Sequence, residues 1–166
     1  MRKLFVVLAG VVLLAGPLVA QQAKPGPLPI LGVWQAVEIN ITGPTPRTLT
    51  FAEPRASLMI FTAKHYSRVE VQSEIPRRPI ADVSKATADE LRAVWGPFVG
   101  EAGTYEVAGN VITMRPIASK NPAVMGPGIF ITYTCKLEGN TIWLTPQRNQ
   151  TGPFPNPFTI KAVRVE

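Results

Sequence analysis

The sequence has almost none of the residues that build disulfides or metal centres. It contains one cysteine, Cys135, and one histidine, His65. An intramolecular disulfide is therefore excluded, and so is a zinc site made of several cysteine and histidine ligands. Cys135 lies in an apolar, strand-like stretch, where a cysteine is typically a small buried residue. We expect no metal or cofactor, and stability must come from a hydrophobic core.

Familiar catalytic motifs are missing as well. There is no phosphate-binding glycine loop and no Gly-x-Ser-x-Gly nucleophile motif. The one adjacent acidic pair, Asp89-Glu90, falls in the first turn of a predicted helix, and His65 falls in a predicted turn. These absences favour a binding protein over an enzyme.

Charge is sparse and scattered. The chain has 17 basic and 11 acidic residues, a net charge of +6. Beyond Arg2 and Lys3, the adjacent basic residues are Arg77 and Arg78 alone. A nucleic-acid-binding domain normally gathers its basic residues on one face or element. We therefore expect no nucleic-acid partner.

The first twenty residues have the layout of a secretory signal peptide. Arg2 and Lys3 precede an apolar run at residues 4–14, and the segment ends on the small residue Ala20. The run is shorter than the roughly twenty residues that a membrane-spanning helix needs. We predict a signal peptide at residues 1–20, no stable membrane insertion after its cleavage, and an exported protein, periplasmic or secreted.

The remaining residues fit one domain. Residues 21–29 contain three prolines and should form an extended tether. Residues 30–166 contain eight or nine short β-rich segments separated by turn signals, which is the pattern of an antiparallel meander barrel or a sandwich. The expected strands are residues 32–39, 48–51, 57–61, 66–71, 104–107, 111–117, 129–137, 141–145 and 158–165.

One short helix is predicted near residues 88–98. Thr87 and Glu90 form a capping-box pattern at its start. The apolar residues after it fall at helical spacing, so one face of the helix is apolar. We expect this face to pack across one end of a barrel. Its apolar residues are Leu91, Val94, Trp95 and Phe98.

Several motifs follow one another in a recognisable order. Gly32-Val33-Trp34 opens the first strand, and residues 58–62 with Tyr66 form a hairpin. Residues 101–107 then join the helix to a strand that begins Gly103-Thr104-Tyr105. This ordered set resembles the bacterial lipocalin-like domain family, within the calycin group of small β-barrels.

The resemblance implies an all-β, antiparallel meander barrel of about eight strands over residues 30–166, with a small-molecule site in its lumen. The chain departs from the family pattern in two places. Lys64-His65 stands where the family usually has an aspartate-glycine turn. Residues 113–115 stand where the family often has polar residues that include histidine.

The resemblance also implies how the barrel closes. Arg164, near the end of the last strand, is similar to the lipocalin arginine that packs on the signature tryptophan. Gly32, Trp34 and Arg164 are therefore expected to join the first and last strands. A guanidinium over the Trp34 ring would add about 0.5–2 kcal/mol as a cation–π contact. Function is expected away from this end, toward the helix and the long loops.

Strand alternation identifies candidate ligand-binding residues but does not show whether their side chains point into the barrel or outward. The candidates are Tyr66, Arg68, Trp95, Arg115 and Tyr133. If the four from the strands point inward, the lumen suits an amphipathic molecule with a carboxylate. If they point outward, the interior is a filled core.

Three functions remain open from the sequence. The first is a barrel that binds a small apolar or amphipathic molecule in its lumen. The second is an enzyme of isomerase or cyclase type, as some lipocalin-fold proteins are, with Glu38 or Glu70 beside Arg68 or Arg115. The third is an envelope interaction protein without a small-molecule site, with the loops at 121–128 and 146–157 as its contact surface.

Overall fold

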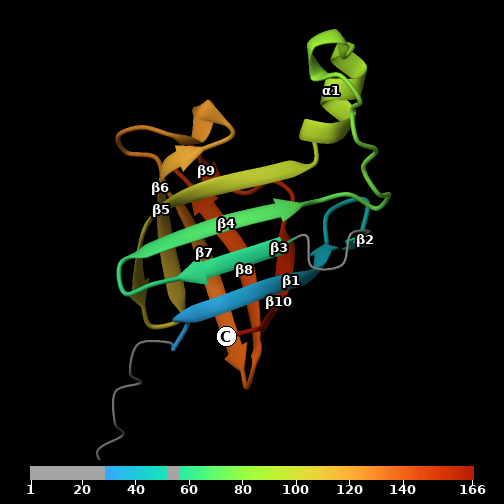
Figure 1. Cartoon of the computed structure of the whole chain (residues 1–166). Helices are drawn as coiled ribbons and strands as arrows, with labels where there is room; N and C mark the ends of the chain where they lie inside the picture. The colour runs from blue at the N-terminus through green and yellow to red at the C-terminus, as the bar shows by residue number, and fades with distance from the viewer. Residues whose placement is uncertain (1–28, 52–56) are drawn as a thin grey trace, which may run out of the picture.

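The computed structural model describes residues 29–51 and 57–166 (Figure 1). The predicted signal peptide and nearly all of the tether lie outside these residues. One α-helix, α1 (Ala88–Trp95), and two 3-10 turns, η1 (Val83–Lys85) and η2 (Pro122–Val124), accompany the strands. The strands are β1 (Gly32–Ile41), β2 (Arg47–Thr50), β3 (Ser57–Phe61), β4 (His65–Val71), β5 (Phe98–Ala108), β6 (Val111–Ser119), β7 (Ile131–Glu138), β8 (Thr141–Asn149), β9 (Gly152–Pro153) and β10 (Phe158–Arg164).

Eight of these strands form a closed antiparallel barrel. Neighbours pair in the order β1, β3, β4, β5, β6, β7 and β8, and β10 pairs with both β8 and β1 to close the ring. The short strands β2 and β9 extend this ring by pairing with β1 and β8. The all-β meander barrel predicted from the sequence is confirmed.

Two strands run through prolines at bulges. Pro116 of β6 faces Gly103 of β5, and Pro146 of β8 faces Tyr133 of β7, and the pairing register shifts at both places. A proline has no backbone N–H to donate, so strands tolerate it mainly at bulges and edges. At the first bulge the backbones come so close that a Cβ on Gly103 would lie 2.0 Å from the Arg115 carbonyl oxygen.

These bulges explain two errors in the predicted strands. The strand predicted to end at Thr145 continues through Pro146 to Asn149 as β8. The strand predicted to begin at Thr104 begins at Phe98 as β5. In both cases a bulge, in β6 opposite Gly103 and in β8 beside Pro146, accommodates turn-forming residues within a paired strand.

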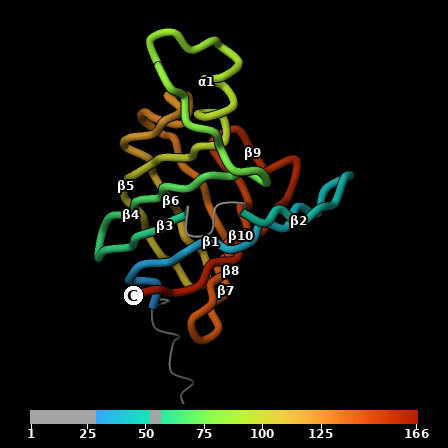
Figure 2. The backbone as a smooth tube through the Cα atoms, turned by 45° about the vertical axis from the view of Figure 1, so that its right-hand side comes forward, coloured from blue at the N-terminus to red at the C-terminus, as the bar shows by residue number. Residues whose placement is uncertain are grey.

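The predicted capping box is present, but the helix does not cover the barrel. The Thr87 side chain accepts a hydrogen bond from the Glu90 backbone N–H, and Glu90 reaches back to Thr87. No residue of α1 is buried, and Trp95 is 51% exposed. Figure 2 shows α1 standing beyond the barrel wall. The prediction that this helix packs across a barrel end is wrong.

The reason lies in how the helical segment is attached. Strands β4 and β5 stay paired to their ends, at Val71 and Phe98. The backbone N–H of Gln72 then donates to the Pro97 carbonyl at 2.8 Å, which holds the two ends of the helical segment next to each other just beyond the strands. Trp95 packs edge-on against Phe98 rather than on the barrel core.

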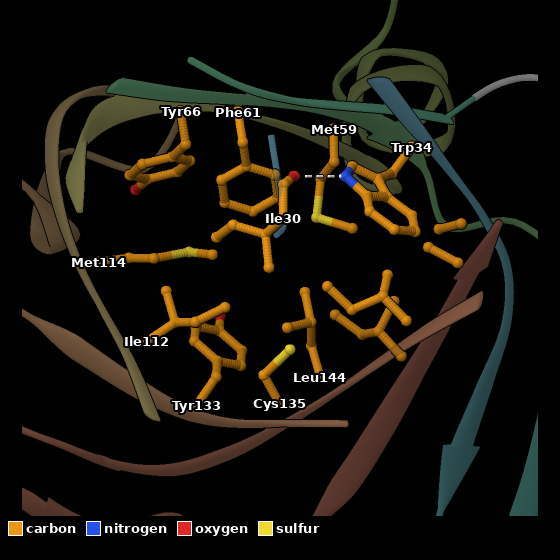
Figure 3. Close-up of a cluster of buried hydrophobic side chains, with 14 of the residues drawn as sticks. Ile30, Trp34, Met59, Phe61, Tyr66, Ile112, Met114, Tyr133, Cys135 and Leu144 are labelled. Carbon is orange, nitrogen blue, oxygen red and sulfur yellow. Dashed lines mark hydrogen bonds between the residues drawn. The ribbon is translucent and has the colours of Figure 1, made fainter. Parts of the chain in front are cut away.

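Apolar side chains from the surrounding strands fill much of the barrel interior (Figure 3). Ile30, just before β1, lies in the middle of this cluster and is 1% exposed. Trp34 is fully buried beside it, and its indole N–H donates to the Ile30 carbonyl at 2.8 Å. The core therefore anchors the chain where it enters the first strand.

Arg164 contacts the start of β1 and the residues just before it from outside the core. Its guanidinium carbon lies 4.1 Å from the centroid of the Trp34 ring, and the two residues are directly paired between β1 and β10. The guanidinium also donates to the carbonyls of Pro29 (2.8 Å) and Leu31. Gly32 has φ of +122°, and a Cβ there would meet the Glu166 carbonyl oxygen at 2.4 Å. The predicted contact between first and last strands is therefore present.

Replacing Trp34 with alanine should lower the free energy of unfolding by about 3–5 kcal/mol, because it removes a buried aromatic ring. Urea denaturation measures this change. The matched control is Trp95→Ala, which truncates an exposed tryptophan and should cost about 1 kcal/mol, the value of its aromatic contact. Equal losses in the two variants would show that Trp34 does not anchor the core.

Candidate functional site: a buried polar cluster inside the barrel

A row of polar side chains on β4 points into the barrel. Tyr66, Arg68 and Glu70 alternate along the strand, and their exposed fractions are 3%, 8% and 0%. Residues two apart on a strand share one face, so all three side chains lie on the interior side. Ser67 and Val69, between them, are more accessible. The structure thus resolves the direction that the sequence left open for this strand.

Arg68 and Glu70 form a buried ion pair. An Arg68 guanidinium nitrogen donates to Oε1 of Glu70. The same carboxylate oxygen also accepts from the side-chain amide of Gln72. Charged groups removed from water require such partners, since an unpaired buried charge is strongly destabilising.

Two further residues complete the polar cluster, which we define as Tyr66, Arg68, Glu70, Glu101 and Tyr133. Glu101 of β5 is directly opposite Arg68 in the pairing of β4 with β5. Tyr133 of β7 is 3% exposed and interacts electrostatically with Arg68 and with both carboxylates. Figure 3 shows Tyr66 and Tyr133 on facing walls of the barrel, with Met114 between them.

The environment of the cluster opposes loss of protons. Burial raises the pKa of Tyr133 to about 12 and raises the pKa of Tyr66 further. Burial also raises the pKa of Glu101, and the negative charge of Glu70 adds to this effect against the opposing pull of Arg68. Desolvation of the charged form is the leading cause in all three residues.

Three buried polar atoms of the cluster have no hydrogen-bond partner among the described residues. They are the Tyr66 hydroxyl, Nε of Arg68 and Oε2 of Glu70. Buried polar atoms in proteins are nearly always paired, because leaving one unpaired costs about 1–3 kcal/mol. The three atoms supply one donor, one acceptor and one hydroxyl that can do both.

The other predicted ligand-binding residues lie elsewhere. The side chain of Arg115 points outward. Its Nη2 lies 3.9 Å from Oε2 of Glu106, and its guanidinium group lies over the ring of Phe130. Its position on β6 follows strand alternation, because the neighbouring Met114 faces the core. Trp95 is on the exposed helix segment. Of the five candidates, Arg115 and Trp95 therefore lie away from the barrel interior, whereas Tyr66, Arg68 and Tyr133 come together in it.

Glu101 was not among the predicted site residues, and Glu70 was considered only as an enzyme candidate. Glu70 could have been predicted, because residues two apart on a strand share one face and Glu70 therefore lies on the same face as Tyr66 and Arg68. Glu101 could not, because its position opposite Arg68 depends on the register between β4 and β5. Glu38, the other candidate carboxylate, instead accepts from the Asn40 side chain at 2.6 Å.

Cys135 and the acidic residues do not form a metal site in the described part of the chain. Within residues 29–51 and 57–166 there is no group of three or more His, Cys, Asp or Glu residues that could hold a metal ion. Cys135 is 3% exposed, and burial raises the pKa of its thiol to about 11. Its thiolate form is therefore disfavoured, and the residue packs as part of the core.

Comparison of the chain with protein-family models, with curated proteins and with solved structures finds no match. Among the helices of residues 29–51 and 57–166, none has the length and hydropathy needed to span a membrane.

The tyrosines should give the protein a characteristic alkaline titration. All three, Tyr66, Tyr105 and Tyr133, have a pKa above the ordinary value of 10.0 in the folded protein. A pKa raised by folding favours the folded state below the ordinary value, and this stability is lost as the pH rises above it. Tyrosinate absorbance should therefore appear near pH 10.0 in denaturant and at a higher pH in the native protein.

The free energy of unfolding should fall over the same range, above pH 10.0. A Tyr66→Phe/Tyr133→Phe variant should show a weaker fall, since it lacks the two most perturbed hydroxyls. Native-state titration of these tyrosines at their ordinary pKa would mean that they are not held in a buried, water-poor environment.

Proposed function

We propose that this chain is an exported, lipocalin-like barrel that binds a small amphipathic molecule. The polar group of the ligand would lie at the polar cluster, and its apolar part would lie against neighbouring core side chains. Export is supported by the signal-peptide layout of residues 1–20, and the family by the motif order along the chain. The observation that carries the binding function is the set of three unpartnered polar atoms in one buried cluster.

The composition of the interior supports this proposal. Small-molecule sites in proteins are mostly apolar, with a few placed polar groups that orient the ligand. Here the polar cluster adjoins apolar residues such as Met59 and Phe61, which pair directly with Arg68 and Tyr66 across β3 and β4. An eight-stranded barrel is also of the size that can hold one small ligand.

The energetic cost of the cluster supports it as well. Burying an ion pair is often no better for stability than packing apolar residues of similar volume. Perturbed ionisable groups held together by specific partners are common at functional sites. Binding gives the buried charges and unpartnered atoms a role that a purely structural core would not need.

Tyr66→Phe tests this proposal with little risk to folding, because its hydroxyl has no partner to lose. We would use a Trp95→Phe/Trp143→Phe background, which leaves Trp34 as the single fluorescent reporter in the core. Hexylamine, hexanol and hexanoate serve as probes that share one tail. The tightest probe should bind about two- to twelvefold more weakly to Tyr66→Phe, the effect of a hydrogen bond of about 0.5–1.5 kcal/mol.

The matched control is Tyr105→Phe. The Tyr105 hydroxyl donates to the Thr62 carbonyl (2.6 Å), at the tip of the β3–β4 hairpin. Binding by this variant should equal that of the background protein. If the two tyrosine variants lose affinity equally, or if no probe binds at all, the binding function at the cluster is rejected.

A second candidate is a lipocalin-fold enzyme of isomerase or cyclase type, and one observation favours it. Burial raises the pKa of Glu101, which lies opposite Arg68, so this carboxyl is the group best placed to exchange a proton with a substrate. It ranks second because Glu70, the other carboxylate, is committed to Arg68 and Gln72. Mass spectrometry of ligand extracted from the native protein separates the two: one species indicates a carrier, and a pair of isomers indicates an enzyme.

A further inference from the structure

The charges of the cluster indicate which polar group it accepts. Arg68 contributes one positive charge, and Glu70 and Glu101 are the two carboxyl groups around it. Carboxyl groups therefore outnumber cations at the cluster. A ligand carboxylate would add a third acid to this set, and like charges at close range repel strongly where water is scarce.

Two of the three unpartnered atoms can accept a hydrogen bond from a ligand, and only Nε of Arg68 can do no more than donate. Arg68 already donates to Glu70 through a terminal guanidinium nitrogen, which removes that nitrogen from bidentate recognition of a second carboxylate. Oε2 of the same glutamate is a buried acceptor without a partner, and the Tyr66 hydroxyl oxygen is a second one. A group with a positive charge and a donor matches Glu101 and the Tyr66 hydroxyl, which is diagonal to it across β4 and β5.

We infer that the polar group bound at this cluster is an ammonium group, so the ligand class is a small amine with an apolar tail rather than a carboxylic acid. This inference rests on the proposed binding function and specifies its ligand. The ammonium group would lie at Glu101, its compensating charge, and donate to the Tyr66 hydroxyl, because Tyr66 is diagonal to Glu101 in the pairing of β4 with β5. A ligand hydroxyl has a single O–H to donate and would leave the excess carboxyl group uncompensated.

The test uses Glu101→Gln, which keeps the shape and polarity of the side chain and removes its charge. Loss of this partly buried acid relieves a desolvation cost, so the variant should fold, and a thermal melt verifies this. Glu106→Gln is the matched control, because Glu106 lies on the same strand but its side chain is 77% exposed, near Arg115. Binding of hexylamine, hexanol and hexanoate is measured by calorimetry at neutral pH.

Wild-type protein and Glu106→Gln should bind hexylamine at least about tenfold more tightly than hexanoate, with hexanol between them. Glu101→Gln should weaken hexylamine binding by about tenfold and leave hexanol binding within about twofold. Tightest binding of hexanoate or hexanol, or hexylamine affinity unchanged in Glu101→Gln, would overturn the amine assignment while leaving the binding function in place. Binding of none of the probes would instead reject the binding function itself.

Discussion

The barrel holds a guanidinium and a carboxylate where almost no water can reach them, and this constraint governs its interior. Arg68 is 8% exposed and Glu70 is fully buried. Neither charge would be stable there without the other, because removing one partner of a buried pair costs about 3–5 kcal/mol. Both residues lie on β4, so the register between β4 and its neighbours fixes which residues surround the pair inside the barrel.

The architecture supplies that register. Direct pairings run from Trp34 to Met59, from Met59 to Arg68, and from Arg68 to Glu101, across four adjacent strands. At one end of this row, Arg164 lies over Trp34 and ties the first strand to the last. At the other end, the bulge beside Gly103 lets β5 approach β6 closely. The contact between Arg164 and Trp34, which closes the barrel, and the polar cluster therefore lie along one row of paired residues that crosses adjacent strands.

Local signals in the sequence predict most of the fold, because turns, caps and alternation act over a few residues. The Thr87 capping box and the breaks between strands at Gly109 and Gly139 are of this kind. The site is less predictable because it depends on contacts between strands. Arg115 was a candidate for the lumen with its direction left open, and Glu101 was not a candidate, whereas strand alternation turns Arg115 outward and the register brings Glu101 opposite Arg68. That exchange replaces a cation with an acid and changes the expected ligand from a carboxylate to an amine.

The central claim is that the buried polar cluster exists for binding rather than for stability. The most direct measurement compares the free energy of unfolding and hexylamine binding of wild type with those of an Arg68→Met/Glu70→Leu variant. If the claim is right, the apolar pair keeps the stability of wild type or raises it by about 1–4 kcal/mol, and hexylamine binding is lost. A variant that loses several kcal/mol of stability, or that still binds hexylamine as wild type does, would contradict it.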